Sequence, residues 1–136
     1  MRKIRTILFP YDGSERCRQM APAVRDWCLR HEASLVVLNV LSMPVALFLD
    51  VPPVAWTDDV ENLRVESRSK MIETLSPVFH DVRTTFIVET GNAAENILKT
   101  ASENGVDLIV MPTHGYGPFR KLLLGSVTSK VLHDAK

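Results

Sequence analysis

Residues 112–126 read Pro-Thr-His-Gly-Tyr-Gly-Pro-Phe-Arg-Lys-Leu-Leu-Leu-Gly-Ser and are the most informative part of the chain. They follow the apolar run Asp107–Met111 and precede a helical pattern, so their glycines lie where a strand passes into a helix. Gly115 and Gly125 have no Cβ and let backbone N–H groups approach a ligand, and Ser126 adds a hydroxyl group at the start of the helix. Phosphate groups bind at such helix N-termini.

Outward from this stretch, apolar runs alternate with helical patterns. Ile4–Phe9 is predicted to be a strand, and Ser34–Leu41 is a second strand that lacks polar alternation, as buried parallel strands do. Between them, Ser14–His31 has apolar residues at three- and four-residue steps, which predicts a helix. The remaining predicted elements are a loop from Ser42 to Ala55, a helix from Asp58 to Ser76, a half-exposed edge strand at Val82–Glu89, a helix capped by Asn92 with Glu95 three residues later, and a buried strand at Asp107–Met111. This alternation predicts an α/β fold with a parallel sheet covered by helices on both faces.

Length and composition predict a single domain over residues 1–136, because the chain has 136 residues of which 46% are hydrophobic. The 16 basic and 16 acidic side chains give a formal net charge of zero, which argues against a dedicated nucleic-acid binder. No stretch approaches the ~20 apolar residues that span a bilayer, and the N-terminus lacks a signal-peptide pattern. We therefore expect a cytoplasmic protein with neither a nucleic acid nor a membrane as its partner.

The two cysteines, Cys17 and Cys28, lie in the first predicted helix about three turns apart. That separation of ~16 Å exceeds the reach of a disulfide. We interpret both as buried small hydrophobic residues rather than redox or metal groups.

A resemblance to a known family rests on two segments. Gly115, nine further residues and then Gly125-Ser126-Val127 resemble the ATP-binding signature of the universal stress protein family. The segment Tyr11-Asp12-Gly13-Ser14-Glu15, after an apolar strand, is similar to the opening loop of that family. The similarity runs nearly from end to end, with one departure: Pro112 stands where the signature has its first glycine.

The resemblance implies a three-layer α/β/α sandwich of the adenine nucleotide alpha-hydrolase-like type, with strand order 3-2-1-4-5. The fifth strand of the family is absent from this sequence. We expect the exposed edge of the fourth strand to be covered, or the sequence to be incomplete, because an unpaired apolar strand promotes aggregation. In this family the last strand often pairs across a dimer axis, and a homodimer is expected here too.

The predicted nucleotide site lies at the switch point between the first and fourth strands, outside their carboxyl ends. Asp12 there either accepts a hydrogen bond from the ligand or caps the following helix. By resemblance, Pro10 and Tyr11 border the base, the backbone of Val40 faces the adenine edge, and Met111 packs near the ribose, although core packing also explains the side chains of Val40 and Met111. The residues expected at the phosphates are His114, Gly115, Gly125, Ser126, Val127 and Thr128.

The function implied is that of a universal stress protein that binds ATP, with or without Mg²⁺, or a related adenine nucleotide, and signals through occupancy of the site. The alternative is a nucleotide-free dimerising module of the same fold, because Pro112 lacks an N–H and crowds the ribose. Losing one donor to a charged acceptor costs ~1.5–3 kcal/mol, so weakened binding is expected rather than none.

Other chemistries find little support in the sequence. Neither a P-loop, a GxGxxG fingerprint after the first strand nor a GxSxG elbow occurs, and the four histidines lack metal-ligand spacing. No catalytic base is identifiable, so slow ATP hydrolysis is the most that we expect of the chain as an enzyme. An adenylate-forming or pyrophosphatase relative of similar topology is disfavoured because the first loop lacks the serine-glycine-glycine-x-aspartate pattern that such an enzyme would resemble.

Overall fold

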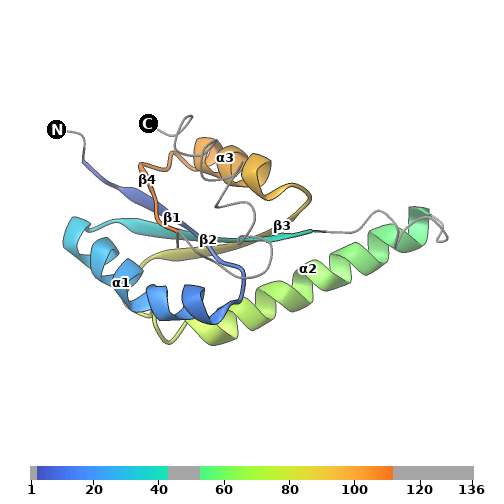
Figure 1. Cartoon of the computed structure of the whole chain (residues 1–136), viewed down its shortest axis with the longest axis horizontal. Coiled ribbons are helices and arrows are strands. Elements are labelled where there is room, and N and C mark those ends of the chain that lie inside the picture. The colour runs from blue at the N-terminus through green and yellow to red at the C-terminus, as the bar shows by residue number, and fades with distance from the viewer. Residues whose placement is uncertain (1–2, 43–52, 112–136) are drawn as a thin grey trace.

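The computed structural model describes residues 3–42 and 53–111, and the side chains of the second range from residue 60 onward. These residues form a four-stranded sheet in the order β3-β2-β1-β4, in which every neighbouring pair is parallel. The elements in chain order are β1 (Thr6–Pro10), α1 (Glu15–His31), β2 (Ser34–Leu41), α2 (Pro53–Leu75), β3 (Thr84–Thr90), α3 (Ala93–Glu103) and β4 (Leu108–Ile109). Helices α1 and α2 cover one face and α3 covers the other, which confirms the predicted three-layer α/β/α sandwich (Figure 1).

The core lies on the two central strands. Ile7, Leu8 and Phe9 of β1 are fully buried, as are Val37 and Leu38 of β2. Both faces of these strands are covered by helices, so successive side chains are buried whichever way they point. This is why β1 and β2 carry continuous apolar runs rather than an alternating pattern.

Helix α1 forms as its sequence pattern predicts, with Ser14 as the N-cap residue rather than the first helical residue. The Ser14 hydroxyl accepts a hydrogen bond from the Cys17 backbone N–H at 3.2 Å. The side chains that α1 buries recur at helical spacing, and they are Cys17, Ala21, Val24 and Cys28. The helix ends at Glu32, which adopts the left-handed conformation with φ 52°.

Helix α2 and strand β1 do not begin where the sequence predicts. Helix α2 begins at Pro53, inside the predicted loop, because proline is well suited to the first helical position, where an N–H would lack an intrahelical partner. Strand β1 begins at Thr6 rather than Ile4, since the backbone N–H groups of Arg5 and Thr6 donate to Asp107 Oδ2 instead of to a neighbouring strand.

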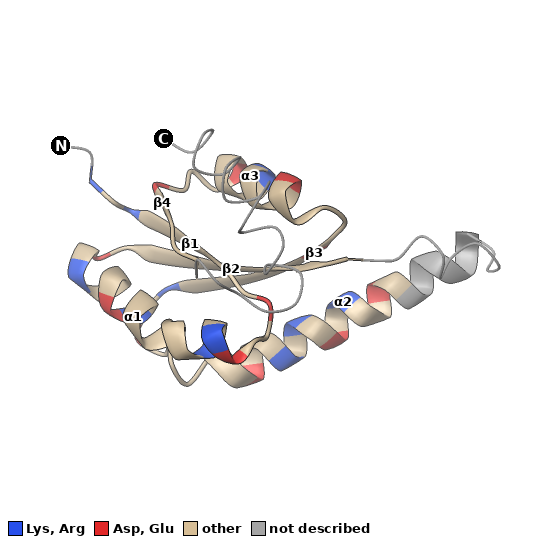
Figure 2. Cartoon of the chain, in the orientation of Figure 1, with Lys and Arg blue, Asp and Glu red and all other residues tan. Residues whose placement is uncertain are grey.

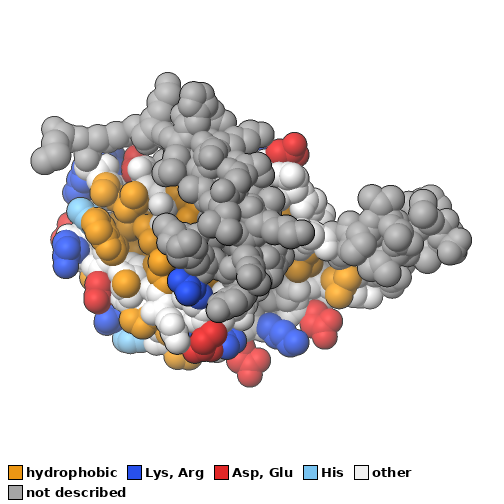
Figure 3. All heavy atoms as spheres, in the orientation of Figure 1, with side chains coloured by type: hydrophobic (Ala, Val, Ile, Leu, Met, Phe, Trp, Pro, Cys, Tyr) orange, Lys and Arg blue, Asp and Glu red, His pale blue; other side chains and the backbone are white. Residues whose placement is uncertain are grey.

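The fourth strand is shorter and less buried than its apolar sequence suggests. Only Leu108 and Ile109 have strand geometry, and the predicted strand Asp107–Met111 is half-buried along its whole length. Among the described strands β4 pairs with β1 alone, so one edge of β4 has no described neighbour. On the face of the molecule that Figure 3 shows, hydrophobic side chains gather over the end of α1 and the adjacent strands.

The predicted edge strand and the capped helix after it are both confirmed. β3 spans Thr84–Thr90 rather than Val82–Glu89, and among the described strands it pairs with β2 alone. Val88 is its one buried residue. Asn92 caps α3 by accepting a hydrogen bond from the Glu95 backbone N–H at 2.9 Å.

Acidic and basic residues are interleaved along the described parts of α1 and α2, without a long run of one sign (Figure 2). Among the described residues, no helix is long and apolar enough to cross a membrane.

Candidate functional site

The candidate site begins where β1 ends, at the switch point of the sheet. From β1 the chain passes through α1 to β2 on one side, whereas β4 lies on the other side of β1. Loops leave in opposite directions at such a point, and the residues that follow the central strand therefore lie where ligands bind in such folds. Those residues are Tyr11, Asp12, Gly13 and Ser14.

Asp12 uses one of its two carboxylate oxygens in the local fold. Oδ1 accepts a hydrogen bond from the Ser14 backbone N–H at 2.8 Å, which forms an Asx turn that leads into α1. Oδ2 is buried and no hydrogen bond to it is found among the described residues, although the Cys17 thiol lies close enough for the Asp12 carboxylate to help raise the pKa of that thiol. A buried acceptor without a partner costs about 1–3 kcal/mol, so this oxygen is a candidate contact for a ligand donor.

The backbone of this loop is set by Gly13 and by an arginine that sequence reasoning missed. Gly13 has φ +81°, a conformation that other residues rarely adopt, while a Cβ there would meet nothing within 4 Å. Arg18 donates from Nη1 to the Gly13 carbonyl at 3.3 Å and forms an ion pair with Glu15 one turn earlier in α1. The signal was the position of Arg18 one helical turn after Glu15, which is typical of a surface pair.

Tyr11 and Pro10 are packed against the core. Tyr11 is 5% exposed, and its N–H donates to the Leu38 carbonyl at 2.8 Å, which extends the β1–β2 pairing. Its ring packs edge-on against Phe9 with centroids 6.0 Å apart. Burial raises the pKa of the Tyr11 hydroxyl above its ordinary value of 10.0, and the nearby Arg18 guanidinium opposes that rise. The Pro10 side chain is fully buried.

The other predicted site residues fall into two groups. Val40 is 3% exposed and belongs to the core, and Met111 is half-buried against it, so core packing accounts for both side chains. Both lie at or just beyond the carboxyl ends of their strands, which is the same end of the sheet as Asp12. The predicted phosphate contacts lie outside the described residues, and so does Pro112; those contacts are His114, Gly115, Gly125, Ser126, Val127 and Thr128.

Cys17 lies directly beneath the loop. Its Sγ is 4.0 Å from the Pro10 carbonyl oxygen, and burial raises the pKa of its thiol to about 12. A thiol with such a pKa is protonated at neutral pH, whereas the thiolate is the form that reacts as a nucleophile or binds a metal. Within residues 3–42 and 53–111, no three His, Cys, Asp or Glu side chains are grouped so that they could hold a metal ion.

The fold and this loop define a class: a small α/β protein with a parallel sheet and a polar loop at its switch point. The family model described as the universal stress protein family matches residues 3–136, and the chain belongs to that family.

Individual relatives agree with this assignment. A universal stress protein of Thermus aquaticus, from the QAH/OAS sulfhydrylase 3' region, is 31% identical over 131 residues, which span 96% of this chain and 93% of the relative. The solved structure of MJ0577 from Methanocaldococcus jannaschii has the same fold, with a TM-score of 0.77 and 24% identity over 99% of this chain and 92% of that one. A universal stress protein solved in complex with cAMP has a TM-score of 0.64 and 15% identity over 99% and 93% of the two chains.

Proposed function

We propose that this universal stress protein binds ATP or a related adenine nucleotide at the carboxyl end of β1 and signals through occupancy of that site. The observation that carries the proposal is the buried Asp12 Oδ2, to which no hydrogen bond is found among the described residues and which lies at the switch point. A ribose hydroxyl or an adenine amino group is a donor that this oxygen can accept. A ligand that binds one conformation preferentially shifts the population that a partner recognises.

Two further observations support this proposal. Gly115, Gly125 and Ser126 have the spacing of a phosphate-binding turn before a helix. Among solved structures with this fold, one universal stress protein is a complex with cAMP, which is itself an adenine nucleotide. We also propose, from family membership, that the protein acts in the cytoplasm as a homodimer.

A substitution at Asp12 can separate ligand binding from the turn that leads into α1, whose N-cap is Ser14 rather than Asp12. In Asp12→Asn the Oδ1 acceptor for the Ser14 N–H is retained, whereas the second oxygen becomes an amide donor. We expect its free energy of unfolding to match that of the parent, while its affinity for a fluorescent ATP analogue falls about ten- to a hundredfold. Asp26→Asn, an exposed change on α1, is the matched control and should bind like the parent.

The same titration with Pro112→Gly tests the departure from the family signature. Restoring an N–H and removing the ring should strengthen binding about tenfold or more. If the parent and Pro112→Gly both fail to bind any adenine nucleotide, the nucleotide proposal is wrong. Pro112 would then favour the second candidate, a nucleotide-free dimerising module of the same fold.

A further inference from the structure

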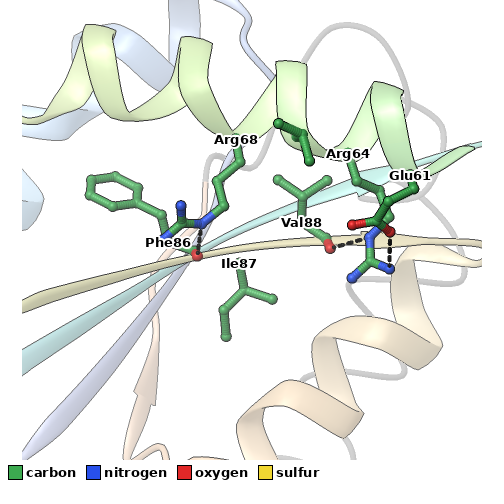
Figure 4. A pocket seen from close by; sticks show the side chains of 7 residues that line it. Glu61, Arg64, Arg68, Phe86, Ile87 and Val88 are labelled. Carbon is green, nitrogen blue, oxygen red and sulfur yellow. Dashed lines mark hydrogen bonds and ion pairs between the residues drawn. The ribbon is translucent and has the colours of Figure 1, made fainter.

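The outer edge of β3 is covered by side-chain donors. The backbone groups of odd-numbered residues face β2, since the Leu35 N–H donates to the Arg83 carbonyl and the Gly91 N–H donates to the Leu41 carbonyl. The even-numbered groups therefore face away from the sheet. Two of these outward carbonyls accept from guanidinium groups of α2: Arg68 Nε donates to Phe86 O at 3.1 Å, and Arg64 Nε donates to Val88 O at 3.2 Å (Figure 4).

Two further outward carbonyls are covered, one just before β3 and one at its last residue. The Thr84 hydroxyl donates to the Val82 carbonyl at 2.9 Å, and Asn96 Nδ2 of α3 donates to the Thr90 carbonyl at 3.2 Å. The donors that cover this edge thus come from both neighbouring helices and from β3 itself. A strand that paired with this edge would have to displace these donors from the carbonyls that they occupy.

The match between helix and strand repeats explains the pair of arginines. Four residues of a helix rise about 6.0 Å, and two residues of a strand rise about 6.6 Å. Two side chains that are four residues apart on α2 can therefore reach two carbonyls that are two residues apart on β3. The order is reversed, Arg64 with Val88 and Arg68 with Phe86, because α2 runs antiparallel to β3. Arg64 is held further by Glu61 at 3.4 Å and by Glu89 at 3.8 Å.

Between α2 and this edge lies a groove of about 210 Å³. The side chains of Phe86 and Val88 line it together with Arg64 and Arg68, whose guanidinium groups extend from α2 across it to the strand (Figure 4). An incoming strand would have to occupy the space next to these carbonyls. The arginine side chains therefore stand where a pairing strand would lie.

We propose that Arg64 and Arg68 close the β3 edge against strand addition, and that this edge, once opened, is a self-association surface for the β3 edge of a second copy. The strand Thr84–Thr90 is rich in β-branched and aromatic residues, which favour strand pairing. A two-fold axis places identical strands antiparallel, and pairing centred on Ile87 would set Phe86 opposite Val88. In that register Phe86 of one copy and Val88 of the other exchange N–H···O bonds. Glu89 of one copy then lies opposite Thr85 of the other rather than opposite another Glu89.

The test compares the double variant Arg64→Met/Arg68→Met with the parent in sedimentation velocity over a range of concentrations. Methionine keeps the length and apolar stem but removes the donors. We expect the apparent mass of the double variant to rise with concentration to at least twice that of the parent, because a second two-fold interface joins whatever assembly the parent forms. Arg16→Met/Arg30→Met, which removes two exposed arginines from α1, is the control for charge and should sediment like the parent.

Two further measurements localise the effect. Amide hydrogen exchange at Phe86 and Val88 should slow with rising concentration in the double variant only, because those N–H groups face the new partner. Arg64→Lys/Arg68→Lys, which keeps donors at both positions, should behave like the parent. The single change Arg68→Met carries the same test if the double variant does not fold. A folded variant that sediments like the parent, or that gains protection at another surface instead of β3, overturns the proposal.

Discussion

Arg25 and Asp81 form a two-point ion pair that joins α1 to the turn before β3. Arg25 Nε lies 3.0 Å from Asp81 Oδ1, and Nη2 lies 2.5 Å from Oδ2, although the residues are 56 positions apart in the chain. Bidentate pairing of this kind is the most favourable geometry for arginine and a carboxylate. The pair therefore joins helix α1 to the connection between α2 and β3.

The ion pair predicts a pH dependence of stability. The Arg25 guanidinium holds the pKa of Asp81 below its ordinary value of 3.8. A carboxylate whose folded pKa is lowered stabilises the folded state fully above its ordinary pKa, and this contribution is lost as the pH falls through the lowered value. Asp81→Asn should therefore lower the free energy of unfolding at neutral pH, and its difference from the parent should shrink below about pH 4.

Urea unfolding at neutral and acidic pH measures this difference. Asp26→Asn is the matched control, because Asp26 lies 3.9 Å from the same arginine but has a more exposed side chain. Its effect should be smaller at both pH values, since exposed pairs contribute little. An Asp81→Asn difference that stays constant from neutral to strongly acidic pH would show that the pair has no such role.

Replacing Glu32 by glycine should stabilise the protein. Glu32 ends α1 at φ 52°, ψ 42°, where its N–H bonds the carbonyls of the last helical turn. The left-handed conformation costs about 1–2 kcal/mol for a residue with a Cβ, and glycine gives back about 0.4–1 kcal/mol through its greater unfolded entropy. We expect Glu32→Gly to gain about 0.5–1 kcal/mol and to raise the melting temperature by about 2–4 °C. Glu32→Ala keeps the Cβ, and thermal unfolding should show no comparable gain.

Removing the cap of α3 should destabilise the protein. Asn92 Oδ1 accepts the Glu95 N–H at 2.9 Å, and alanine leaves that donor without its partner. We expect Asn92→Ala to cost about 1 kcal/mol in denaturant unfolding, whereas Asn92→Ser, which also caps, should cost little. Equal losses in the two variants would mean that the amide acts through something other than capping.

The two cysteines should be unreactive in the folded protein. Cys17 is fully buried and Cys28 is 1% exposed, and burial raises their thiol pKa values to about 12 and about 11. At pH 7 the thiolate fractions are then about 10⁻⁵ and 10⁻⁴. A chromogenic disulfide reagent should react with both thiols only after unfolding in denaturant. Rapid reaction of either thiol in the native protein would contradict their burial.

The order of elements was readable from the sequence because the physical signals are local. Continuous apolar runs identified the buried strands β1 and β2, and β2 was predicted with its observed bounds, Ser34–Leu41. Asn92 with Glu95 and the apolar steps of α1 predicted their helices for the same reason. Predictions failed where distant residues decide: β4 is apolar in sequence, yet its length and burial depend on which strands lie beside it.

The candidate site divides along the same line. The sequence determined the loop after β1, because its residue types and spacing are local and match those of the family. Only the tertiary structure decided that one oxygen of Asp12 accepts the Ser14 N–H in the turn before α1 while the other is buried at the switch point, since burial depends on packing around β1. Likewise, Arg64 and Arg68 look like ordinary surface residues until the fold brings β3 beside α2, with partners 24 and 18 positions away in the chain. Local patterns specify secondary structure, whereas a contact between distant residues exists only once the chain has folded.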